Sequence, residues 1–250
     1  MNNKILITGA NGFIGKTLVS FLKDKFDLVL VDRDFDHEFK NTISKSINIQ
    51  TYTCDFISEE SRNVFIKSVL DNNKYLNAII NNAAFVGDSS LDGWNADFCE
   101  QSVNTFRDAL EVNLISCFHL IRDFSRILVN SDKSSIINIS SIYGTCAPKW
   151  NLYEDTSMNN PAAYGVSKSG LNYLTKWLAS VLAPIKVNAI SLGGISRNQP
   201  DNFIKKYEEM TPMRRMGKET DILSCVKFLL SEETNYVTGQ NIFIDGGWSI

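Results

Sequence analysis

The chain has 250 residues, of which 44% are hydrophobic, and it carries a formal net charge of −3 at pH 7. This length and composition suffice for one large domain with a full core. The acidic balance and the lack of a basic stripe argue against nucleic acid as a partner, and no segment has the apolar length of a membrane span.

The cysteines and histidines argue against a disulfide framework and against a metal site. The cysteines are odd in number, and no two form a C-x-x-C pair. His37 and His119 stand alone, without other ligands at metal-binding spacing. The N-terminal stretch "MNNKILITGA" has too short an apolar run for a secretory signal. We therefore expect a cytoplasmic protein that binds a small molecule and no metal.

Short apolar runs alternate with longer amphipathic stretches along the chain. The runs are rich in β-branched residues and predict buried strands at 4–8, 28–32, 49–55, 77–81, 135–140, 185–191 and 241–245. The stretches with helical periodicity lie at about 13–24, 59–72, 102–129, 162–181 and 219–231. This alternation predicts an α/β fold with one domain over 1–250: a Rossmann-type doubly wound parallel sheet of about seven strands with helices on both faces.

Three segments are candidate substrate loops at the edge of this sheet. The segments 85–100 and 193–218 follow the fourth and sixth predicted strands and exceed the usual connection length. The segment 145–160 follows the fifth predicted strand in the same way. The carboxyl ends of parallel strands meet at one edge, so these loops should gather around one site.

The first predicted turn has the pattern of a phosphate site. "ILITGANGFIG" places glycines directly after a strand and at the start of a helix, where free N–H groups and the positive end of the helix dipole meet a pyrophosphate. The alternative interpretation is an ordinary tight turn. The candidate contacts of the turn are Gly9, Asn11, Gly12, Phe13, Ile14 and Gly15.

The end of the second predicted strand should bind the ribose of the cofactor. Asp32 lies there, and its carboxylate can accept hydrogen bonds from both ribose hydroxyls and repel a 2′-phosphate. The neighbouring Arg33 could instead pair with a 2′-phosphate. On balance these two residues favour NAD over NADP.

A serine, a tyrosine and a lysine surround the loop after the fifth predicted strand. Tyr164 and Lys168 are four positions apart and share one face of a helix, so the ammonium should lower the pKa of the phenol towards the working range of a base. Ser141 ends the strand and can bond a substrate oxygen. A bare Y-x-x-x-K pair is often ordinary helix surface, but here it follows "NISS" within a dinucleotide fold.

Six motifs together resemble the short-chain dehydrogenase/reductase family. They are "TGANGFIG", "NNAA" at 81–84, "EVNL" at 111–114, "NISS" at 138–141, "YGVSK" at 164–168 and "TGQNIFIDGG" at 238–247. The resemblance spans essentially the whole chain. It implies an oxidoreductase that moves hydride between nicotinamide and a secondary alcohol or ketone.

The same resemblance implies roles for individual residues. It implies a catalytic tetrad of Asn113, Ser141, Tyr164 and Lys168. In this tetrad Tyr164 would be the general acid or base, and Asn113 would interrupt its helix and hold a water. Lys168 would also bind the nicotinamide ribose. The implied cofactor contacts are Asp55, Phe56, Asn82, Ala83, Ala84, Gly194 and Ile195, together with Tyr164 and Lys168. Taken alone, Asn113 could be polar helix surface and Asp55 a strand-end cap.

Two features depart from the commonest members of that family. The spacing G-x-x-G-x-x-G is more usual in its extended branch, whose members often act on sugar nucleotides. "SLGGI" places Leu192 where the family usually has proline, which puts the contacts of Gly194 and Ile195 in doubt.

The long loop before Tyr164 suggests a sugar as substrate. Lys149, Trp150, Tyr153 and Glu154 combine aromatic faces with charged groups, which suit the apolar faces and polar rims of a sugar. The alternative is that Trp150 and Tyr153 form a subunit contact. This loop and "GGISRNQPDNF" at 193–203 also resemble the oxidoreductases called flagellin modification protein A, which implies a role in bacterial glycan biosynthesis.

Two other functions stay open at this point. One is a 3-oxoacyl thioester or carbonyl reductase, whose substrate would need an entry groove with basic residues. The other is a dinucleotide-binding protein without turnover, against which Ser141, Tyr164 and Lys168 together argue. The resemblance also implies a homodimer or homotetramer, because the two long helices pair between subunits in that family, and "GGWSI" at the C-terminus would join a second interface.

Overall fold

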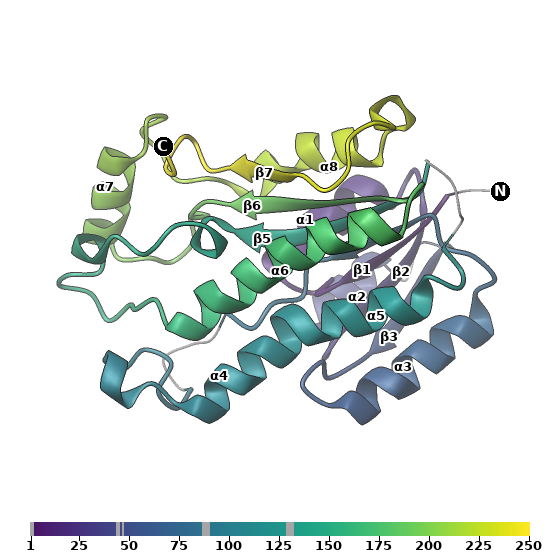
Figure 1. Ribbon diagram of the computed structural model, residues 1–250, viewed down its shortest axis with the longest axis horizontal. Coiled ribbons are helices and arrows are strands. Elements are labelled where there is room, and N and C mark those ends of the chain that lie inside the picture. Colours follow the sequence, from purple (N-terminus) through teal and green to yellow (C-terminus); the bar gives the residue numbers. More distant parts are fainter. Residues whose placement is uncertain (1–2, 44–45, 47, 87–90, 129–132) are drawn as a thin grey trace.

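The computed structural model describes residues 3–43, 46, 48–86, 91–128 and 133–250. One sheet runs through it, and all of its strands except β4 are labelled in Figure 1. The strands are β1 (Lys4–Thr8), β2 (Asp27–Asp32), β3 (Ile49–Thr53), β4 (Ala78–Asn81), β5 (Ser135–Ser141), β6 (Lys186–Leu192) and β7 (Asn241–Ile244). All the predicted strands are confirmed within a few residues at their ends.

The sheet is parallel throughout, in the order β3-β2-β1-β4-β5-β6-β7. The chain therefore adds β2 and β3 on one side of β1. It then crosses to the other side of β1, where β4, β5, β6 and β7 follow in order. Loops leave β1 and β4 in opposite directions at this switch point, which opens a crevice at the carboxyl ends of the strands. The predicted fold class is confirmed.

Helices cover both faces of the sheet, as Figure 1 shows. α1 (Phe13–Leu22), α2 (His37–Ile43) and α8 (Leu223–Leu230) share one apolar core. α3 (Glu59–Asn72), α5 (Ser116–Phe124) and α6 (Ala162–Val181) share the core on the opposite face. The inward residues of β1 divide between the cores, with Ile5 and Ile7 in the first and Leu6 in the second. This alternation explains why the strand is a continuous apolar run.

Three helical details differ from the sequence prediction. The helix expected over 102–129 is α4 (Val103–Leu110), a π-helical turn at Glu111–Ile115, and α5; residues 129–132 lie outside the described part. The helix expected over 219–231 begins with a 3-10 turn at Glu219–Ile222. α2 was not predicted at all, because its seven residues carry only a weak apolar period.

The segment 193–218, expected to be a loop, contains α7 (Asp201–Met210). Its apolar stripe is short: Phe203 and Tyr207 are its buried residues, one turn apart. Tyr207 stacks on Trp248, with ring centroids 5.9 Å apart. Trp248 is itself buried within the chain, whereas Ile250 at the C-terminus is exposed, and the interface expected for "GGWSI" stays a prediction. The helix is stabilised by a partner some forty residues away, which no local pattern reveals.

No helix in the described ranges combines the length and the apolar character that a membrane span requires. All five cysteines are free. Nowhere in the described part of the chain do three or more histidine, cysteine or acidic side chains gather as a metal site would need.

Candidate active site

The glycine-rich turn between β1 and α1 is shaped by two close approaches. Gly9 has a φ of +66°, and a Cβ there would lie 2.7 Å from the Cα of Ala83. A Cβ on Gly15 would lie 2.0 Å from the carbonyl oxygen of Gly9. Gly12 caps α1, and a Cβ there would meet only that carbonyl, at 3.4 Å. The turn is therefore packed on the sheet side and open at Gly12, where the N–H groups of α1 can meet a phosphate.

The segment after β4 holds this turn in place. The side-chain amide of Asn82 donates to the carbonyl of Gly9 at 2.9 Å, and the backbone N–H of Ala83 donates to Oγ1 of Thr8 at 2.9 Å. Asn82 and Ala84 also line the cavity described below. Asn82 thus links β1 to the segment after β4, and the cofactor contacts of all three residues stay a prediction.

Asp32 ends β2 directly beside the turn. Its carboxylate accepts hydrogen bonds from the backbone N–H groups of Asn11 and Arg33, both at 2.8 Å. Burial raises the pKa of this carboxyl above its ordinary value, against the lowering effect of those two N–H donors. The oxygens keep further lone pairs, so the group can still accept from ribose hydroxyls. The Arg33 side chain is exposed at the same corner.

Asp55 and Phe56 follow β3 and differ in position. Asp55 is exposed, and its carboxylate accepts from the N–H of Ile57 at 3.0 Å, which is the strand-end cap considered as the alternative for this residue. Phe56 is buried in the core, edge-to-face against Phe65 with centroids 6.4 Å apart. Its side chain therefore packs inside the core and is not available to a cofactor.

Ser141, Tyr164 and Lys168 line one cavity of about 320 Å³ at the carboxyl ends of the strands. Ser141 ends β5, and the other two lie in the first two turns of α6. Nζ of Lys168 donates to the carbonyl of Ile139 at 2.8 Å and lies 5.9 Å from the centroid of the Tyr164 ring. The structure thus brings together the three side chains that the sequence pattern singled out.

The pKa of Tyr164 differs from the sequence expectation. Burial raises it above its ordinary value, and this effect outweighs the lowering by the hydrogen bond with Ser141 and by the charge of Arg197. The lowering expected from Lys168 is not found in this structure. Burial also lowers the pKa of Lys168 to about 8. Burial therefore separates the two groups in proton affinity, and the phenol of Tyr164 holds its proton more tightly than the ammonium of Lys168.

Asn113 lies in the middle of the π-helical turn and is fully buried. Its side chain accepts from the N–H of Phe85 at 2.6 Å and donates to Oγ of Ser167 at 2.9 Å. The helix interruption expected at this residue is present, and π-turns of this kind often mark functional sites. Asn113 joins the segment after β4 to α6, next to the turn that carries Tyr164 and Lys168.

A hydroxyl network forms the outer wall of the cavity. The hydroxyls of Tyr143 and Tyr153 are 2.6 Å apart, and the side-chain amide of Asn160 donates to that of Tyr153 at 3.0 Å. All three residues line the cavity. Of the predicted substrate residues in the loop before Tyr164, Tyr153 is therefore the one that lines this cavity.

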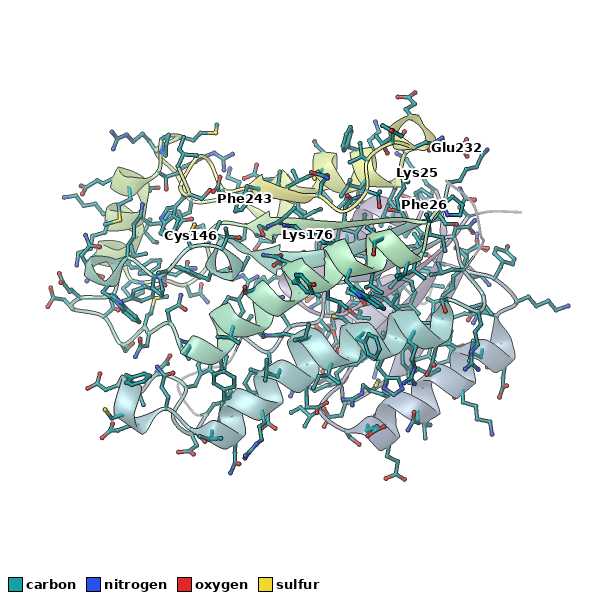
Figure 2. The ribbon with its side chains drawn as sticks, in the orientation of Figure 1. Lys25, Phe26, Cys146, Lys176, Glu232 and Phe243 are labelled. Atoms are coloured by element: carbon teal, nitrogen blue, oxygen red, sulfur yellow. The ribbon has the colours of Figure 1, made fainter. Side chains whose placement is uncertain are left out.

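The other three predicted substrate residues lie outside this cavity. Trp150 is 57% exposed and lines a neighbouring groove of about 560 Å³. Lys149 lies over Trp248, with Nζ 4.3 Å from the ring centroid, and Glu154 is exposed. Cys146, from the same groove, is labelled in the left half of Figure 2, and Lys25 and Phe26, which precede β2, in the right half.

Gly194 and Ile195 line the cavity despite the unusual Leu192 before them. The N–H of Gly194 donates to the hydroxyl of Tyr207 at 2.6 Å, so α7 holds the segment from outside. The N–H of Gly217 donates to the carbonyl of Gly194 at 2.9 Å. Here a tyrosine and a backbone bridge supply the rigidity that proline would otherwise give.

The architecture and the motifs agree with a comparison against family models. The model described as enoyl-(acyl carrier protein) reductase matches residues 14–249. The chain belongs to the short-chain dehydrogenase/reductase family. It is an NAD(P)-dependent oxidoreductase of that family.

Three relatives show how this family member compares with known proteins. The post-translational flagellin modification protein A of Campylobacter coli is 32% identical over 100% of both chains. The 3-oxoacyl-[acyl-carrier-protein] reductase FabG of Staphylococcus epidermidis is 26% identical over 99% of both chains. A short chain dehydrogenase of Leptospira borgpetersenii, solved with bound NAD+, has a TM-score of 0.85 and 32% identity, covering 100% of this chain and 94% of that one.

Several cavity residues of this short-chain dehydrogenase/reductase were missed by the sequence reasoning. Arg197, Gln199 and Phe203 lie within the loop "GGISRNQPDNF", which the sequence marked as a site without singling out its side chains. Tyr143 is two residues after Ser141, so its place in chain order could have indicated it. Tyr207 carries no local signal.

Proposed function

We propose that this oxidoreductase transfers hydride at a secondary alcohol or ketone of a sugar or sugar derivative in glycan biosynthesis. The observation that carries the proposal is the joint lining of one cavity by Ser141, Tyr164 and Lys168 beside the glycine-rich turn. When bound, the nicotinamide cofactor supplies or accepts the hydride. The side chains of this chain would supply orientation and the proton.

Each of the four tetrad residues has a task in this proposal. Ser141 would hold the substrate oxygen, and Tyr164 would give or take its proton. Lys168, with a pKa of about 8, stays largely charged at neutral pH and would stabilise the phenolate. Asn113 would fix the loop after β4 relative to α6 and would hold a water for proton transfer.

The sugar assignment is supported by two observations. The wall of the cavity offers aromatic rings together with hydroxyl and amide groups from Tyr143, Tyr153 and Asn160. Such a wall suits a ring with apolar faces and a rim of hydroxyls. The relative of 32% identity over the full chain is a flagellin modification protein, which supports a role in modifying a glycan.

The experiment compares the wild type with Tyr164→Phe. We expect turnover to fall by about 10²–10⁴, because the proton donor is lost, while cofactor affinity stays within a few-fold. The substrate panel would contain sugars, sugar alcohols and nucleotide-linked sugars. Turnover of each substrate would be followed by the absorbance of NADH. Unchanged turnover in Tyr164→Phe would contradict the assigned mechanism.

A 3-oxoacyl thioester reductase is the second candidate. The neighbouring groove is lined by apolar side chains, among them Trp150 and Val166, and could hold an acyl chain. The FabG relative at 26% identity supports this alternative. Reduction of acetoacetyl-CoA by the purified enzyme, together with no activity on any sugar, would favour it.

We further propose that NAD is preferred over NADP, through Asp32, and that the enzyme works in the cytoplasm as a homodimer or homotetramer. Apolar and aromatic side chains are exposed along the outer faces of the π-turn, α5 and α6. They are Ile115, Phe118, Val166, Tyr173, Trp177 and Val181. Light scattering after size exclusion would test the assembly, and a monomer would contradict it.

A further inference from the structure

The cavity around Tyr164 carries positive charge, and no carboxylate is among the described residues that line it. Among the described residues that line it, Lys168 and Arg197 are the charged side chains. Lys168 is 2% exposed, and its ammonium is committed to the carbonyl of Ile139. Arg197 is the cation that remains available to a ligand, and the net positive charge favours an anionic one.

Arg197 reaches across the cavity from the segment after β6 to the start of α1. Its Cζ lies 4.6 Å from the centroid of the Phe13 ring. Phe13 is the first residue of α1 and directly follows Gly12, the N-terminal cap. The charge of Arg197 also acts on Tyr164, whose pKa it lowers. The guanidinium therefore lies within range of both the phosphate-binding turn and the phenol.

The backbone of Arg197 is fixed, whereas its guanidinium is loosely held. The N–H of Arg197 donates to Oε1 of Gln199 at 2.6 Å, and the Gln199 amide donates to the carbonyl of Ile195 at 2.8 Å. Nε is 3.8 Å from Oε1 of Glu219, longer than the 2.7–2.9 Å of a charge-assisted hydrogen bond. Within the described ranges, the two Nη nitrogens have no hydrogen-bond acceptor, and this fork can still bind an anion bidentately.

We propose that Arg197 binds the pyrophosphate of the nicotinamide dinucleotide at the phosphate on its nicotinamide side. This inference rests on the cofactor site of the proposed function and adds a residue to it. The N-terminus of α1 and Gly12 would face the pyrophosphate. Arg197 lies beside this turn and close enough to Tyr164 for its charge to act on the phenol, so it would meet the phosphate on the nicotinamide side. Arg197 would thus connect the segment after β6 with the glycine-rich turn through the bound cofactor.

The alternative anionic ligand for Arg197 is an acidic substrate. Phe13 argues for the cofactor, because it belongs to the turn that binds phosphate and is 61% exposed beneath the guanidinium. The two sources make different predictions for binding in the absence of any substrate. Only a contact with the cofactor changes cofactor affinity by itself.

The test measures binding to the wild type, Arg197→Gln and Arg197→Lys by calorimetry. Arg126→Gln is the matched control, because Arg126 follows the end of α5 and its side chain is 74% exposed. The ligands are the reduced cofactor that the wild type binds more tightly (NADH or NADPH), ADP and AMP. The β-phosphate of ADP stands in for the phosphate on the nicotinamide side, which AMP lacks.

We expect Arg197→Gln to weaken the dinucleotide and ADP about tenfold or more, and AMP less than twofold. Arg197→Lys should recover part of the loss, since it keeps the charge without the planar fork, and Arg126→Gln should change nothing. Equal dinucleotide affinity in Arg197→Gln and wild type would overturn the inference, as would an equal loss for AMP. A wild type that binds neither NADH nor NADPH would instead refute the proposed function.

Discussion

Replacing Lys168 by methionine should stabilise the folded protein near neutral pH while it removes activity. Lys168 is 2% exposed and has a pKa of about 8, against 10.5 for the free side chain. At about 1.36 kcal/mol per pH unit, burial of this ammonium costs roughly 3 kcal/mol of folding stability. Methionine has a similar length and no charge, so it removes that cost.

Part of the gain is offset by the carbonyl of Ile139, which loses its donor at 2.8 Å. An unsatisfied buried acceptor costs about 1–3 kcal/mol. We therefore expect Lys168→Met to be more stable than the wild type at pH 7 by between zero and about 2 kcal/mol. Activity should be lost, because the phenolate of Tyr164 would have no neighbouring charge from Lys168.

The pH dependence tests this reasoning more sharply than the value at one pH. Between pH 8 and 10.5 the unfolded wild type binds more protons than the folded one, so its stability rises with pH relative to the variant. From pH 7 to pH 10, we expect urea denaturation to show the difference moving by roughly 2–3 kcal/mol in favour of the wild type.

The matched control is Lys176→Met, on the same helix, where Figure 2 shows the labelled side chain and the residue is exposed. Its effect on stability should be small and independent of pH, because an exposed ammonium loses little hydration on folding. A difference between Lys168→Met and wild type that stays constant from pH 7 to pH 10 would refute the buried-ammonium interpretation.

Three further predictions follow from the turn, the ribose corner and a buried histidine. Gly15→Ala should lower the free energy of unfolding in urea by more than about 2 kcal/mol, because its Cβ would meet a carbonyl oxygen at 2.0 Å. Gly12→Ala should fold normally, and equal losses of stability in the two variants would contradict the packing argument. Asp32→Ser should shift the ratio of NADPH to NADH affinity towards NADPH about tenfold, and an unchanged ratio in fluorescence titrations would remove Asp32 from ribose recognition. Burial lowers the pKa of His119, so its contribution to stability is present above about pH 6.5 and declines as the pH falls; His119→Gln should flatten this decline between pH 7 and pH 5, and an identical slope would refute it.

The amino-acid sequence by itself determined the strands and the phosphate turn. Apolar β-branched runs mark buried parallel strands because covered strands need both faces apolar. The glycines of "TGANGFIG" are equally local signals, since the turn and its close backbone approaches require the absence of a Cβ at Gly9 and Gly15. Tyr164 and Lys168 could be paired because their helical spacing fixes them on one face.

Only the tertiary structure decided the rest of the site. α7 depends on the packing of Tyr207 against Trp248, and Arg197 reaches Phe13 across a fold that joins residues almost two hundred positions apart. The raised pKa of Tyr164 also depends on burial, which follows from the loops that close the cavity and from no feature of the Y-x-x-x-K motif. Local sequence fixes which groups share a helix face or a turn, whereas burial and long-range contacts set their charge and their partners.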